Sequence, residues 1–72
     1  MEIKKHIDGK WMTSEYDHKG HLIQIKSRPS HGMKAHIWNE DKTKVIKTFR
    51  YSFVSPVFLL QKAKNYIDSI TS

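Results

Sequence analysis

The C-terminal part of the chain constrains the fold most, because residues 55–71 carry the pattern of an amphipathic helix. Ser55 followed by Pro56 is typical of a helix start, since the hydroxyl can accept from a free amide and proline has no amide to leave unpaired. Apolar residues then recur every three or four positions, at Leu59, Leu60, Ala63, Tyr66, Ile67 and Ile70. A helix with such a stripe needs a second layer to cover it.

Length and composition limit what that layer can be. The 72 residues fit one domain over residues 1–72, near the lower size limit for an unstapled core. The absence of cysteine excludes disulfides, thiol catalysis and thiolate metal sites. The longest apolar run, residues 57–60, is too short for a signal peptide or a membrane span, so we expect a cytoplasmic protein.

The sequence before the helix predicts strands separated by turns. Alternation of apolar and polar residues predicts strands at residues 10–16, 21–27, 33–39 and 44–51. Ile3 and Ile7 fit only a brief additional strand, which the Asp8-Gly9 pair would end. The predicted fold is therefore α+β: an antiparallel meander of three to four strands with one C-terminal helix packed on one face.

Strand alternation also predicts which side chains form the core. The register of the last strand is chosen to place Phe49 inward, because the opposite register would bury Ile46 and expose Phe49. The inward set is then Ile23, Ile25, Met33, Ala35, Ile37, Val45 and Phe49.

The positive charge is concentrated in the middle of the chain. Residues 19–50 carry eight cations against Glu40 and Asp41, a net of +6, whereas residues 1–18 sum to −1 and residues 51–72 to +1. This distribution favours an anionic partner, either nucleic acid or an acidic protein surface. A membrane surface is not expected, since the helix must cover the sheet and its polar side has only Lys62 and Lys64 as cations.

The face of the sheet away from the helix collects the candidate binding residues, which are Lys26, Arg28, Lys34, His36, Trp38, Lys44 and Arg50. We expect Arg28 and Arg50 to make bidentate contacts with phosphate or guanine, and Trp38 to stack on a base or sugar. Two simpler interpretations stay open. The face is an ordinary solvated surface, or the N-terminal segment packs over Trp38.

Two short stretches and one residue add a family resemblance. Residues 32–38, GMKAHIW, are similar to the middle strand of the DNA-binding domains of plant ethylene-response factors and the arm-binding domains of tyrosine recombinases. Residues 47–49 resemble the end of their third strand, and Ala63 matches a small residue where their helix meets the sheet. The likeness covers about half the chain. It departs from those families in being lysine-rich and in having an extra N-terminal segment.

The resemblance implies a particular way of binding DNA. In those families the open sheet enters the major groove, and arginine and tryptophan side chains make the contacts. By that likeness the contacting residues here are Arg28, Lys34, Trp38, Lys44 and Arg50.

Histidines and carboxylates do not combine into a predicted catalytic or metal site. Asp17, His18 and His21 are the best metal candidates, but they would form an exposed site with no thiolate and no supporting shell. No nucleophile motif, paired carboxylates or glycine-rich phosphate loop is present. We therefore expect no metal, no cofactor and no enzymatic activity.

Two functions follow from the sequence. The first is a small non-enzymatic nucleic-acid-binding module that uses the open basic face of its sheet. The alternative is a small protein–protein interaction or inhibitor protein, of the kind that phages and mobile elements encode, docking on an acidic surface of a larger protein. A homodimer is compatible with either.

Overall fold

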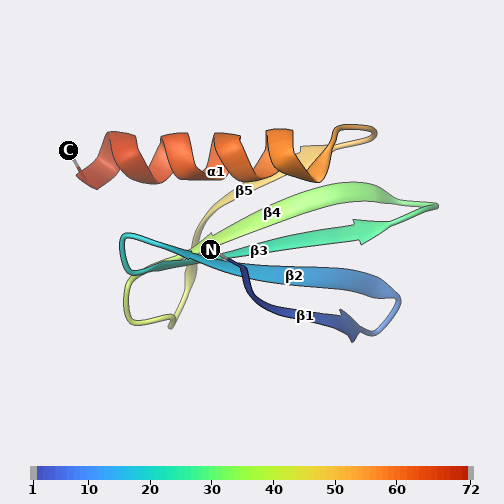
Figure 1. The fold of residues 1–72 in the computed structure, drawn as a ribbon, viewed down its shortest axis with the longest axis horizontal. Helices are drawn as coiled ribbons and strands as arrows, with labels where there is room; N and C mark the ends of the chain where they lie inside the picture. Colours follow the sequence, from blue (N-terminus) through green and yellow to red (C-terminus); the bar gives the residue numbers. More distant parts are fainter. Residues whose placement is uncertain (1, 72) are drawn as a thin grey trace.

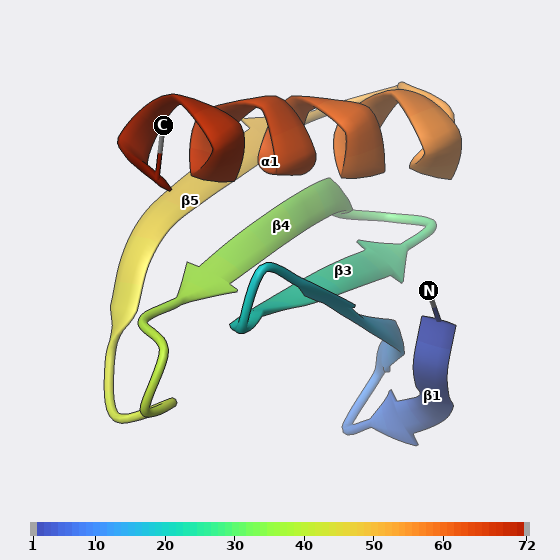
Figure 2. The ribbon, with the colours of Figure 1, turned by 60° about the vertical axis from the view of Figure 1, so that its left-hand side comes forward.

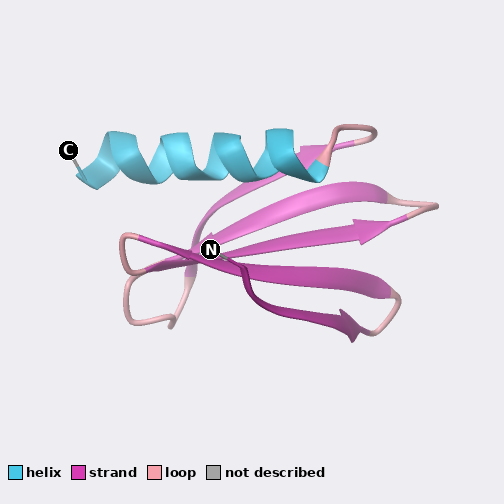
Figure 3. Cartoon of the chain, in the orientation of Figure 1, coloured by secondary structure: helices cyan, strands magenta, loops and turns pink. Residues whose placement is uncertain are grey.

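The computed structural model describes residues 2–71, with the side chains of residues 2, 3 and 8 outside that description. It contains five strands and one helix (Figures 1 and 3). In chain order these are β1 (Glu2–Asp8), β2 (Trp11–His18), β3 (His21–Arg28), β4 (Gly32–Trp38), β5 (Val45–Tyr51) and α1 (Pro56–Thr71).

The strands form one antiparallel sheet in the order β1-β2-β3-β4-β5, so every strand pairs with its neighbour in sequence. The α+β class, the meander and the C-terminal helix are confirmed, but the strand count is five rather than three to four. The additional N-terminal strand is present as β1 and ends at Asp8, as the Asp8-Gly9 pair predicts. Gly9 has a φ of 65° and turns the chain, so that β1 pairs with β2 as an edge strand.

The helix begins where the sequence predicts. Ser55 Oγ accepts a hydrogen bond from the Phe58 amide at 3.0 Å, which caps the first turn. Leu59, Ala63 and Ile67 are fully buried and point at the sheet. The helix packs over β3 and β4, and Figure 1 shows it lying along the strands on one side of the sheet.

The sheet side of the core is mostly as predicted. Ile23, Ile25, Ala35 and Ile37 are buried, with Met33 and Phe49 partly buried against them. Val45 is the exception, because it is 37% exposed and lies outside this cluster.

A bulge in the pairing of the last two strands explains the error at Val45. Ile37 pairs with Lys47, but Trp38 pairs with Val45, so the alternation slips by one residue between these pairs. A register extended backwards from Phe49 cannot place Val45 correctly. Lys47 lies on the helix side, with its ammonium 5.3 Å from the Phe49 ring centre.

Two tight turns need residues with positive φ. Lys19 and Gly20 have φ of 52° and 84° and form the two-residue hairpin that fixes the register of β2 and β3. Gly32 has a φ of 83°, and a Cβ there would lie 2.7 Å from the Tyr51 carbonyl oxygen on the next strand. Gly32 therefore permits both the turn into β4 and the close approach of β5.

Candidate functional site

The open face of the sheet, opposite the helix, is built by residues that alternate with the core positions. Cross-strand pairing places Lys26 of β3 directly opposite Lys34 of β4, and Lys34 directly opposite Arg50 of β5. Because paired residues on neighbouring strands have Cβ atoms about 4.5–5.5 Å apart, three cations stand side by side across the sheet. We call Lys26, Lys34 and Arg50 the cationic row.

Lys26 sits deepest in this row. Its side chain is only 9% exposed, and its ammonium donates to Thr13 Oγ1 at 3.3 Å. Thr13 is fully buried, although no second helix lies over this face within residues 2–71. Figure 2 shows the strong twist of the sheet, with β1 turned away from the direction of β4. The surrounding side chains of the open face therefore enclose the centre of the sheet.

The other two cations of the row are more accessible. Among the side chains that the structure describes, neither Lys34 nor Arg50 takes part in a salt bridge; the ion pairs found among them involve His6, His18, Lys19 and His21. Like charges directly opposite each other on a sheet are destabilising. The row is thus a place where an added anion would relieve repulsion.

The pKa of His36 is lowered by burial and in part by the positive charges of this face. It lies next to the row, between Gln24 and Thr48, and its Nδ1 is 3.1 Å from Thr48 Oγ1. Burial lowers the pKa of His36, and the positive charges of Lys34, Lys26 and Arg50 lower that pKa further. The neutral imidazole is therefore favoured while no anion is bound.

Glu15 supplies a negative charge to the β1–β2 side of the open face. Its carboxylate accepts a hydrogen bond from Gln24 Nε2 at 2.8 Å and lies 3.5 Å from His6 Nε2. The hydrogen bond from Gln24 is the largest cause of the lowered pKa of Glu15. The Glu15 carboxylate is therefore paired with Gln24 and His6.

Trp38 lies on the open face in a fixed orientation. Its indole Nε1 donates to Gln24 Oε1 at 2.8 Å, and the side chain is half-buried. Ile7, one of the two residues predicted as a possible cover for Trp38, is 73% exposed and lies on β1, with β2 and β3 between it and β4, so it does not cover the indole. The side chain of Ile3, the other residue predicted for that role, lies outside the described part of the structure.

Trp11 is the residue of this face that sequence reasoning missed. The Lys34 ammonium lies 4.4 Å from the centre of the Trp11 ring, and the Arg28 guanidinium carbon lies 6.0 Å from it. The His31 ring meets the indole edge-on at 6.1 Å between centroids. The sequence does contain a signal for this position. Pairing β2 with β3 outward from the two-residue turn at Lys19 and Gly20 places Trp11 across from Arg28.

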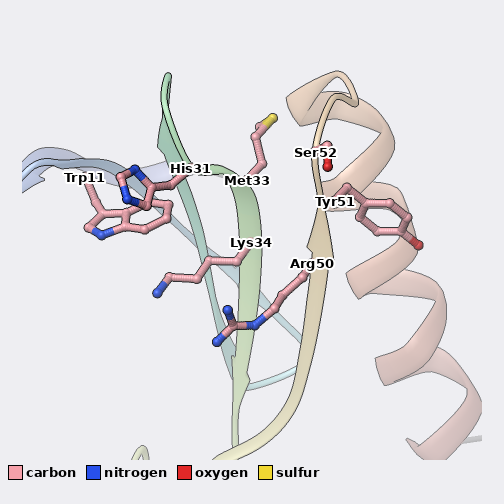
Figure 4. Close-up of a pocket in the computed structure, with 7 residues that line it drawn as sticks. All are labelled: Trp11, His31, Met33, Lys34, Arg50, Tyr51 and Ser52. Atoms are coloured by element: carbon pink, nitrogen blue, oxygen red, sulfur yellow. The ribbon is translucent and has the colours of Figure 1, made fainter.

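A pocket of about 190 Å³ opens beside Trp11. Figure 4 shows Lys34 and Arg50 extending from β4 and β5 towards the side on which Trp11 lies, while Tyr51 points to the helix. Among the described residues no carboxylate lines this pocket, whose walls are Trp11, His31, Met33, Lys34, Arg50, Tyr51 and Ser52. The pocket is therefore cationic and partly aromatic, which suits a phosphate next to an aromatic group.

The seven predicted site residues do not all meet. Lys26, Lys34 and Arg50 form the row, Arg28 lies beside Trp11, and His36 and Trp38 adjoin the row. Lys44 does not belong to this face as predicted, because β5 begins after it. Lys44 is instead exposed in the turn of residues 39–44, where its carbonyl accepts from the Asn39 amide at 3.0 Å.

The histidines proposed as metal candidates have other partners. His18 Nε2 lies 2.8 Å from the Asp68 carboxylate, and His21 Nδ1 donates to the Trp38 carbonyl at 2.8 Å. Within the described residues, no group of three or more histidine, aspartate or glutamate side chains is arranged to hold a metal ion.

Comparison with protein-family models, with curated proteins and with solved structures finds no match for this chain. The resemblance to plant ethylene-response factors and recombinase arm-binding domains therefore stays a prediction. Over residues 2–71, the structure has no helix that is long and apolar enough to cross a membrane.

Proposed function

We propose that this protein is a small non-enzymatic nucleic-acid-binding module that contacts phosphates through its open face. The observation that carries the proposal is the cationic row of Lys26, Lys34 and Arg50, which pairs like charges directly across three strands. A protein whose only requirement was solubility would gain from placing carboxylates among these cations, since opposite charges across a sheet stabilise it.

The spacing of the row favours a polyanion. Neighbouring strands lie about 4.8 Å apart, so the row spans about 10 Å. Duplex DNA carries one phosphate charge for each 1.7 Å or so of its axis, and a single strand is also densely charged. Arg50 is suited to a bidentate phosphate contact, whereas Lys34 acts as a mobile point charge.

The test is a titration with fluorescently labelled DNA and RNA at two or more salt concentrations. Binding should weaken steeply with salt, with a slope of log K against log salt of roughly −0.7 to −0.9 per neutralised phosphate. Arg50→Gln should reduce the magnitude of this slope by about one phosphate contact. Lys44→Gln is the matched control, because it removes an exposed cation outside the row. No binding of any nucleic acid at low salt would refute the proposal.

A second candidate function is docking on an acidic region of a larger protein. Its support is an apolar groove of about 180 Å³ whose walls include Met12, Phe53 and Arg28. Phe53 is 92% exposed and Met12 56%. The net charge of +6 argues for a partner that combines apolar and acidic side chains.

The two candidates separate in a nuclease-treated co-purification followed by reconstitution from purified components. A stoichiometric protein complex that Phe53→Asp abolishes and Arg50→Gln leaves intact would favour the protein partner. Loss of all bound material on nuclease treatment would favour nucleic acid.

A further inference from the structure

The cationic pocket differs from the rest of the open face because one aromatic ring and two cations share it. Trp11 comes from the start of β2, Lys34 from β4 and Arg50 from β5, so three separate strands contribute to one hollow of about 190 Å³. Lys34 and Arg50 make no salt bridge with any side chain that the structure describes. A ligand for this hollow needs a negative group and an adjoining planar group.

In the free protein the Lys34 ammonium lies over the Trp11 ring. At 4.4 Å from the ring centre it makes a cation–π contact, and such contacts are weak where water has access. Stacking of a base on an aromatic side chain is stronger. A phosphate that draws Lys34 towards Arg50 would therefore expose the indole to a base of the same nucleotide unit.

The two tryptophans of the open face are not equivalent. The Nε1 of Trp38 is bound to Gln24 Oε1 at 2.8 Å, and Trp38 lies outside the pocket lining. Among the described interactions Trp11 has only ring contacts, with Arg28, Lys34 and His31, and the first two of these are cations that a phosphate would attract. Trp11 is thus the ring that can exchange its contacts for a base.

The geometry points to single-stranded nucleic acid as the ligand of this pocket, with one base stacked on Trp11 and the adjoining phosphate held by Lys34 and Arg50. This inference rests on the function proposed above and specifies its ligand. In a duplex the bases are stacked on one another and their faces are not available to the indole, whereas a single strand can splay a base out. This mode of binding differs from the one that the family resemblance implies, in which the open sheet enters the major groove of a duplex.

Tryptophan fluorescence provides the direct test, because the chain has two tryptophans and each can be isolated. In the Trp38→Phe protein, Trp11 is the sole reporter, and oligothymidine of about 12 nucleotides should quench it on binding. Inorganic polyphosphate, which carries the charge but no base, should bind without comparable quenching. A duplex of the same length should also leave the fluorescence largely unchanged.

Affinity measurements on Trp11 variants complete the test. Trp11→Ala should weaken oligothymidine binding roughly 5- to 150-fold and polyphosphate binding far less, whereas Trp11→Phe should retain most of the affinity. Circular dichroism establishes that both variants are folded.

The outcomes distinguish this inference from the function on which it rests. Equal binding of duplex and single strand that does not depend on Trp11 would overturn the single-strand inference and leave the nucleic-acid function standing. No binding of either form at about 20 mM salt, where phosphate contacts are strongest, would overturn both.

Discussion

Replacing Arg50 with glutamine should stabilise the free protein while weakening its binding to nucleic acid. Arg50 is exposed and faces Lys34, which itself faces Lys26, so the substitution removes one directly opposed pair of like charges. Glutamine keeps much of the side-chain length and leaves the backbone pairing of β5 unchanged. Opposite changes in stability and binding are the signature of a site kept under electrostatic strain for a ligand.

The magnitude follows from the pairing geometry. Charged pairs directly opposite each other on neighbouring strands contribute about 0.2–1 kcal/mol, and like charges are destabilising. The free energy of unfolding should therefore rise by about 0.2–1 kcal/mol. In a domain of this size that corresponds to an increase in Tm of roughly 1–8 °C.

Urea and thermal unfolding followed by circular dichroism, at low and high salt, provide the assay. The gain should be largest at about 10 mM salt and shrink towards zero near 1 M, where the Debye length falls to about 3 Å. Lys44→Gln, with the same charge change outside the row, should stay within about 0.5 kcal/mol of the wild type. A destabilised Arg50→Gln protein, or a gain that does not depend on salt, would refute the idea of electrostatic strain.

Three further predictions concern the core, a turn and the pH response. Leu59→Ala should lower the free energy of unfolding by roughly 2–5 kcal/mol in urea titrations, because Leu59 is fully buried between helix and sheet; a loss below about 1 kcal/mol would contradict this packing. Gly32→Ala should lower it by about 1–2 kcal/mol or more, since its φ is positive and the new Cβ would meet the Tyr51 carbonyl; unchanged stability would show that the turn can relax. The pKa of His36 is below its ordinary value of 6.5 in the free protein, so stability attributable to His36 should fall as pH drops below about 6.5. Bound phosphate should raise that pKa, so affinity should increase as pH falls through the same window, and it should do so less in His36→Gln; an equal pH response in both proteins would exclude His36 as the source.

The helix and most of the core could be predicted because their signals are local. The Ser55 cap and the stripe through Leu59, Ala63 and Ile67 depend on residues within a few positions of one another. The lone helix then determines which face of the sheet is covered. That is why the predicted face placed Lys26, Lys34 and Arg50 on one surface.

The sequence-based predictions that were wrong or incomplete all depend on how the strands pair. β1 has few apolar residues, and it is placed by its antiparallel pairing with β2, which composition does not reveal. The bulge after Ile37 moved Val45 out of the core, and β5 begins only after Lys44. The place of Trp11 beside Lys34 likewise depends on three strands being in register.

Chemical-shift mapping of the amide and indole NH groups during titration with oligothymidine would show which face of the protein binds the nucleic acid. We expect the largest shifts on β3, β4 and β5 around Lys34 and Arg50 and on the Trp11 indole, with α1 little affected. Shifts concentrated on α1 around Lys62 and Lys64, or no shifts at about 20 mM salt, would contradict a nucleic-acid-binding role for the open face.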